Sequence, residues 1–85
     1  MKNIRIILQE IDEELRIKFQ STRGLTSIQE SWIINAVKTV SDAINLDTCL
    51  NPFQERFLKE NWIIFFKDGK STDVLIVATW INSCQ

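Results

Sequence analysis

The sequence predicts an all-α protein, a compact four-helix bundle in which residues 1–85 form a single domain. Three observations lead to this prediction. Apolar residues recur at helical spacing along the chain, and capping signals precede several of these segments. The apolar content of 45% with 25% charged residues is ordinary for one small folded domain. The expected helices span about 3–22, 27–45, 52–67 and 72–83.

The first expected helix has one apolar stripe. Its spacing of three and four residues places one set of side chains on one side of the helix: Ile4, Ile7, Leu8, Ile11, Leu15 and Phe19. Charged residues fill the other side, where Asp12 and Arg16 form an i to i+4 pair in the favourable order. Arg23 and Gly24 are typical of a last turn followed by a C′ glycine.

The second expected helix begins at one of two overlapping capping boxes, Thr26 with Gln29 or Ser27 with Glu30. The apolar residues that follow cover more than half of the helix circumference. We therefore expect this helix to be more deeply buried than the first.

The third expected helix begins at Asn51-Pro52, an N-cap residue followed by proline at N1, with Gln54 at N3. Glu55 and Lys59 add a further i to i+4 pair. The first half of this helix carries apolar side chains that we expect on one face: Phe53, Phe57 and Leu58.

The segment 61–81, NWIIFFKDGKSTDVLIVATWI, has two interpretations. In the first, the third helix continues to about residue 67, Gly69 takes a left-handed conformation, and Ser71 or Thr72 caps a fourth helix. In the second, the fold is α+β, with three helices and a C-terminal β-hairpin of strands 61–67 and 73–81 around the Asp68-Gly69 turn. The lack of apolar and polar alternation favours the helices.

In either interpretation, the two apolar blocks of segment 61–81, on either side of its polar centre, are apolar on every side and must be enclosed. One chain of this length offers a central position to few elements, so we expect a surface for self-association or for a partner. The aromatic residues expected to anchor that surface are Trp62, Phe65, Phe66 and Trp80. The alternative is that these four residues simply belong to the core.

An acidic run, Glu10, Asp12, Glu13 and Glu14, lies in the first expected helix. Its members point in different directions, so they do not form a paired acid and base, and a solvated face is the simplest interpretation. As a functional alternative, Glu10, Glu13 and Glu14 are expected to provide charge complementarity to a partner.

The sequence offers no pattern for catalysis. It contains no histidine, which removes the commonest general base and metal ligand. Cys49 and Cys84 have no metal-binding spacing and are expected to be buried and reduced. Gly24 and Gly69 are solitary and lie in no phosphate-binding loop. We therefore predict no catalytic residue, no metal site and no cofactor.

The overall charge and hydropathy restrict the class of partner. The net charge is −1, with basic residues interspersed among acidic ones, so no nucleic-acid partner is expected. No stretch reaches the length of a membrane span or of a signal-sequence core, and a cytoplasmic location is expected.

These observations predict a small non-catalytic protein-binding module. We expect it to act as a regulator or inhibitor, of the immunity, antitoxin or adaptor type, through an apolar aromatic surface. A structural or assembly subunit that forms a homodimer or larger homo-oligomer is the alternative from another class. An enzyme that uses carboxylates or Cys49 is the third and least favoured.

Overall fold

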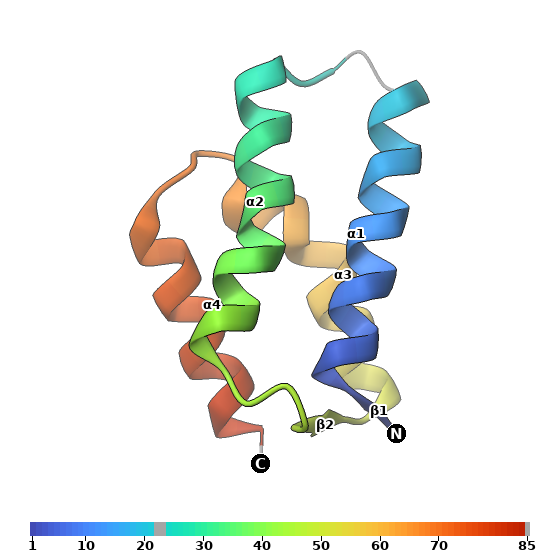
Figure 1. The fold of residues 1–85 in the computed structure, drawn as a ribbon, viewed down its shortest axis with the longest axis vertical. Helices are drawn as coiled ribbons and strands as arrows, with labels where there is room; N and C mark the ends of the chain where they lie inside the picture. Colours follow the sequence, from blue (N-terminus) through green and yellow to red (C-terminus); the bar gives the residue numbers. More distant parts are fainter. Residues whose placement is uncertain (22–23, 85) are drawn as a thin grey trace.

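The computed structural model describes residues 1–21 and 24–84, apart from the side chain of Ser21. It is an all-α four-helix bundle, as predicted, with a very small two-stranded sheet that was not predicted (Figure 1). The elements are β1 (Lys2–Asn3), α1 (Ile4–Ser21), α2 (Ser27–Ala43), β2 (Cys49–Leu50), α3 (Pro52–Phe66) and α4 (Ser71–Ser83). The two helices α3 and α4 occupy segment 61–81, so the alternative with a C-terminal hairpin is wrong.

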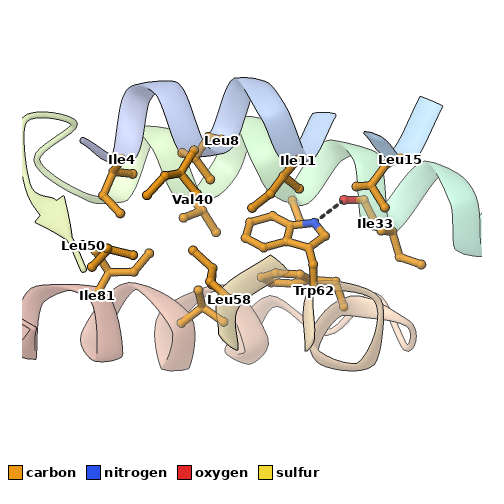
Figure 2. Close-up of a cluster of buried hydrophobic side chains, with 14 residues drawn as sticks. Ile4, Leu8, Ile11, Leu15, Ile33, Val40, Leu50, Leu58, Trp62 and Ile81 are labelled. Atoms are coloured by element: carbon orange, nitrogen blue, oxygen red, sulfur yellow. Dashed lines mark hydrogen bonds between the residues drawn. The ribbon is translucent and has the colours of Figure 1, made fainter. Parts of the chain in front are cut away.

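The four helices enclose one apolar core. Figure 2 shows α1 and α2 on one side of the core side chains and α3 and α4 on the other. Because α1 buries its whole stripe from Ile4 to Leu15, it is more deeply buried than α2, contrary to the expectation for these two helices. The apolar face of α2 is too wide for its neighbours to cover, and Ile28 and Trp32 remain exposed.

Capping boxes set the starts of α2 and α3, as predicted. At α2 the Thr26 hydroxyl accepts from the backbone N–H of Gln29 at 3.2 Å, and at α3 the Asn51 side chain accepts from that of Gln54 at 2.8 Å. In both boxes the glutamine side chain bonds back to the backbone of the cap residue. The predictions for the N-cap of α4 and for the end of the first helix were not confirmed.

The N-cap of α4 is Lys70, without a side-chain cap, so neither Ser71 nor Thr72 has the predicted role. At the end of the first helix, the predicted last turn at Arg23 lies outside the described residues. The N-caps located correctly from the sequence are therefore the two with a complete capping box.

Gly69 makes the tight turn between α3 and α4. Its φ of 65° lies in the left-handed region that only glycine adopts without strain, as predicted for this position. The Trp32 ring of α2 also packs directly over it, because a Cβ at this position would lie 2.3 Å from Trp32 Cδ2. Both backbone conformation and close approach therefore require glycine here.

The antiparallel pair β1 and β2 joins the start of the chain to the connection between α2 and α3. Beside it, the backbone N–H of Ile4 donates to the carbonyl of Thr48 at 2.8 Å. The N–H of Ile6 donates to the Asn3 side chain at 3.1 Å. The first turn of α1 thus finds hydrogen-bond partners outside the helix, as an N-terminus requires. The start of the chain and the end of α4 lie at the same end of the bundle as this sheet (Figure 1).

Candidate protein-binding surface

The outer side of α3, opposite the core, carries an exposed apolar stripe. Asn51 and Pro52 fix where the helix begins, and the spacing of four and seven residues then places Phe53, Phe57 and Ile64 on one side. Their exposed fractions are 74%, 39% and 62%. A second stripe on the same helix points into the core and contains Leu58, Trp62 and Phe66. Consequently α3 has two apolar faces, and only one is covered.

Helix α4 extends the exposed stripe. The turn at Gly69 returns the chain so that α4 packs against α3. The ring of Phe57 lies 5.4 Å from that of Trp80 and 6.2 Å from that of Phe65, measured between centroids. One turn before Trp80, Ile76 is 62% exposed. We call these six residues the outer surface: Phe53, Phe57, Ile64, Phe65, Ile76 and Trp80.

The exposed apolar area of the outer surface is comparable with that of the largest apolar patch on a typical monomer. Its four most exposed members, Phe53, Phe57, Ile64 and Ile76, together expose roughly 450 Å² to water, taking a phenylalanine as about 200 Å² and an isoleucine as about 180 Å². The largest apolar patch of a typical monomeric protein is about 300–600 Å² and is often functional. The outer surface is therefore a reasonable candidate for a binding site.

Two opposite charges lie within the stripe on α3. Arg56 and Glu60 follow Phe53 by three and seven residues, which places them on the same side of the helix. Both are exposed, and neither forms an ion pair or side-chain hydrogen bond with another residue in the described part of the chain. The polar side chain of Asn61, by contrast, donates to the carbonyl of Phe57 at 2.8 Å.

The structure separates the four aromatic residues expected at a partner surface. Trp62 and Phe66 are 1% and 2% exposed, so they belong to the core, as the alternative interpretation had it. Their rings lie 4.6 Å apart, and the indole N–H of Trp62 donates to the carbonyl of Ile33 at 3.1 Å (Figure 2). We therefore correct their assignment: a partner that docks on the folded chain cannot reach either side chain. Phe65 and Trp80 are half-buried and stay in the outer surface.

The acidic residues expected at a partner surface lie on α1 rather than on α3 or α4. Glu10 accepts hydrogen bonds from Lys2, at 2.7 Å, and from Lys59. The hydrogen bond from Lys2, followed by that from Lys59, holds the pKa of Glu10 below its usual value. Glu14 is 3.8 Å from Lys59, and Glu13 is exposed. Glu10 is thus engaged within the chain, whereas Glu13 and most of the Glu14 side chain are exposed to water.

Lys59 is the centre of this ion-pair network, of which the sequence predicts only the pair with Glu55. Its ammonium group contacts Glu10 on α1 and, at 3.1 Å, Glu55 one turn earlier on α3. Burial by itself lowers the pKa of Lys59, but hydrogen bonds to these two carboxylates raise it above the usual value overall. The predicted pair of Glu55 with Lys59 and that of Asp12 with Arg16, at 3.0 Å, are both confirmed.

Ile64 and Ile76 were not predicted to lie at a surface, and Phe53 and Phe57 were predicted to share a face with Leu58, which is buried. A signal was present, because Phe53, Phe57 and Ile64 share one helical stripe whereas Leu58, Trp62 and Phe66 share another. Two apolar stripes on one helix indicate one core face and one face available for binding.

Other kinds of site have less support. No group of three or more Cys, Asp or Glu side chains among residues 1–21 and 24–84 is placed to hold a metal ion. Both cysteines are free, but Cys49 is exposed rather than buried as expected. Burial raises the pKa of the Cys84 thiol. None of the described helices combines the length and apolar character needed to cross a membrane.

Comparison with known proteins gives no relative: no family model, no curated protein and no solved structure matches this chain.

Proposed function

We propose that this chain is a non-catalytic protein-binding module and that its binding site is the outer surface of α3 and α4. The observation that carries the proposal is the second apolar face of α3, which α4 extends and which the rest of the bundle leaves in water. Aromatic residues such as Phe57 and Trp80 are enriched at the centres of protein interfaces.

The size of the outer surface fits this function. Burying about 450 Å² of apolar area at about 25 cal/mol per Å² stabilises a complex by roughly 11 kcal/mol. Association costs about 4–15 kcal/mol in lost translational and rotational freedom. The apolar contacts are therefore of the right size to anchor a partner, and polar contacts at the rim are needed to make binding tight and specific.

Two further features support binding without catalysis. The chain has no histidine, and its most connected carboxylates, Glu10 and Glu55, are engaged by lysines. The proposal includes the cytoplasmic location expected from the sequence, which fractionation of the source cells checks.

The proposal is tested by comparing matched surface variants as immobilised baits. Phe53→Asp combined with Ile64→Asp places two charges in the outer surface. Ile17→Asp changes a residue of α1 that is similarly exposed, at 68%, and serves as the control. Extract of the source cells is passed over the wild-type chain and both variants, and the retained proteins are identified by mass spectrometry.

We expect proteins that are retained by the wild-type chain and by Ile17→Asp to be lost with the double variant. Hydrogen exchange of the purified complex should then show protection in α3 and α4. Equal retention by all three baits, with circular dichroism confirming that each is folded, would mean that the outer surface is not the binding site.

A further inference from the structure

We propose that the protein bound at the outer surface is a second copy of this chain, placed by a twofold axis that sets the two α3 helices antiparallel. This inference rests on the proposed function, because it uses the same surface and names its occupant. It is carried by the charge pattern of the stripe and by the area that a stable dimer needs.

The charges on the α3 stripe are complementary to those on the same stripe of a second copy in antiparallel orientation. Arg56 and Glu60 have opposite signs, share the exposed side of the helix, and have no partner among the described residues of the chain. In a twofold dimer, a contact between one residue of the first copy and another residue of the second copy is always matched by the same contact with the two copies exchanged. Arg56 can therefore meet Glu60 of the second copy twice in one dimer.

The apolar residues agree with the same axis. A twofold axis that pairs Arg56 with Glu60 crosses the helix midway between them, at the level of Leu58. The midpoint between Phe53 and Ile64 lies only half a residue further along the helix, so the same axis nearly pairs these two residues. An antiparallel pair centred there places Phe53 of one copy within one residue, about 1.5 Å along the axis, of Ile64 of the other. A parallel arrangement would instead place each charge next to the identical charge, which is repulsive.

The area of the outer surface also fits a dimer. A standard interface buries about 800 Å² on each partner, and about 56–65% of that area is apolar. The exposed apolar area of roughly 450 Å² provides most of what one side of such an interface requires. Helix α4 contributes Ile76 and Trp80 along one border of the α3 stripe, so the second copy would cover both helices.

The first test is the mass of the full chain in solution, measured by sedimentation equilibrium from roughly 1 µM to 0.5 mM. We expect the wild-type chain to reach twice the monomer mass within this range. Phe53→Asp should weaken the dimer at least 100-fold, because each substitution occurs twice in one interface. A wild-type chain that remains monomeric at the highest concentration overturns the inference.

Two neighbouring residues of α4 provide a matched control. Ile76 and Leu75 are 62% and 68% exposed but lie about 100° apart around the helix, and only Ile76 belongs to the outer surface. Ile76→Asp should dissociate the dimer, whereas Leu75→Asp should leave its dissociation constant within about threefold of wild type. Equal weakening by the two variants overturns the inference.

Charge reversal tests the antiparallel register. Arg56→Glu and Glu60→Arg should each weaken the dimer about tenfold, since each makes two contacts repulsive. The double variant restores both pairs in reversed order and should recover most of the wild-type affinity. A double variant that is weaker than either single variant overturns the proposed register, provided that circular dichroism shows the variants to be folded.

The failures of the two proposals can be distinguished. In one outcome, the wild-type chain is monomeric, and a different protein is retained by the wild-type bait and lost with the Phe53→Asp and Ile64→Asp double variant. This outcome would overturn the second copy as the occupant and would support the outer surface as the binding site. A dimer that persists in Phe53→Asp, together with unchanged bait retention, would overturn both.

Discussion

The two apolar faces of α3 differ in their surroundings rather than in composition. The inner face carries Leu58, Trp62 and Phe66, and the outer face carries Phe53, Phe57 and Ile64, with similar residue types and helical spacing. The inner side chains are at most 2% exposed, whereas the outer ones retain between 39% and 74% of their exposure. The comparison shows that apolar character alone does not assign a residue to the core. The inner face should determine whether the chain folds, and the outer face what it binds.

The largest effect on stability is expected at the inner face. Trp62→Ala removes a buried aromatic ring and its hydrogen bond to Ile33, and should lower the free energy of unfolding by about 3–5 kcal/mol. Small domains are stable by only about 5–15 kcal/mol, so this variant should be close to unfolding. Urea titration followed by circular dichroism measures it. Trp62→Phe should cost clearly less, and equal losses would show that ring volume is not what stabilises this position.

The turn that sets the angle between α3 and α4 should have the next largest effect. Gly69→Ala forces a left-handed conformation on alanine and brings its Cβ against Trp32, which should cost about 1–3 kcal/mol of unfolding free energy. Thermal and urea unfolding measure the loss. In a Trp32→Ala background the close approach is gone and only backbone strain remains, so Gly69→Ala should cost less there. An unchanged cost would assign the whole effect to backbone conformation.

The ion-pair network should give a smaller effect that depends on pH. The pKa of Glu10 is lower in the folded chain than its usual value of 4.5, so the unfolded chain takes up the proton first. The stabilisation by Glu10 is therefore present above about pH 4.5 and is lost as the pH falls through the folded-state pKa. The raised pKa of Lys59 acts in the opposite direction: its stabilisation is fully present below about pH 10.5 and is lost as the pH rises through the folded-state pKa.

This pH dependence is checked by urea unfolding of the wild-type chain and of Glu10→Gln between neutral and acidic pH. We expect the wild-type chain to be more stable near pH 7 and the difference to decrease below about pH 4.5. A difference that is independent of pH would show that the charge of Glu10 is not what stabilises the network.

The smallest effect on folding is expected at the outer face. Phe53→Ser should change the free energy of unfolding of the monomer by no more than about 0.5 kcal/mol, because the side chain is already 74% exposed. The same variant should weaken self-association strongly. Unfolding is measured at a concentration where the wild-type chain is monomeric, and a loss above 1.5 kcal/mol would remove the distinction between the two faces.

The sequence was sufficient where structure depends on near neighbours. The capping boxes at Thr26 and Asn51 and the glycine turn at residue 69 each involve a few consecutive residues, and all three were predicted correctly. The pairs of Asp12 with Arg16 and of Glu55 with Lys59 are one helical turn apart and were predicted for the same reason.

The sequence was insufficient where distant segments meet. Which side of α3 faces the core depends on how α2 and α4 pack on it, so Trp62 and Phe66 could not be separated from Phe65 and Trp80 by composition. The contact of Glu10 with Lys59 joins residues 49 positions apart. The strands β1 and β2 are two residues long and have no alternation to detect.

The hydrogen bonds at the start of α1 suggest where this chain can be divided into two pieces that recombine. The amides of Ile4 and Arg5 donate to the carbonyls of Thr48 and Leu46, so an N-terminal fragment that stops at the end of α2 lacks both acceptors. A fragment of residues 1–50 retains them together with β2, and a fragment of residues 51–85 begins with its own cap, Asn51. The peptide bond between Leu50 and Asn51 is therefore the natural division for a split reporter built on this bundle.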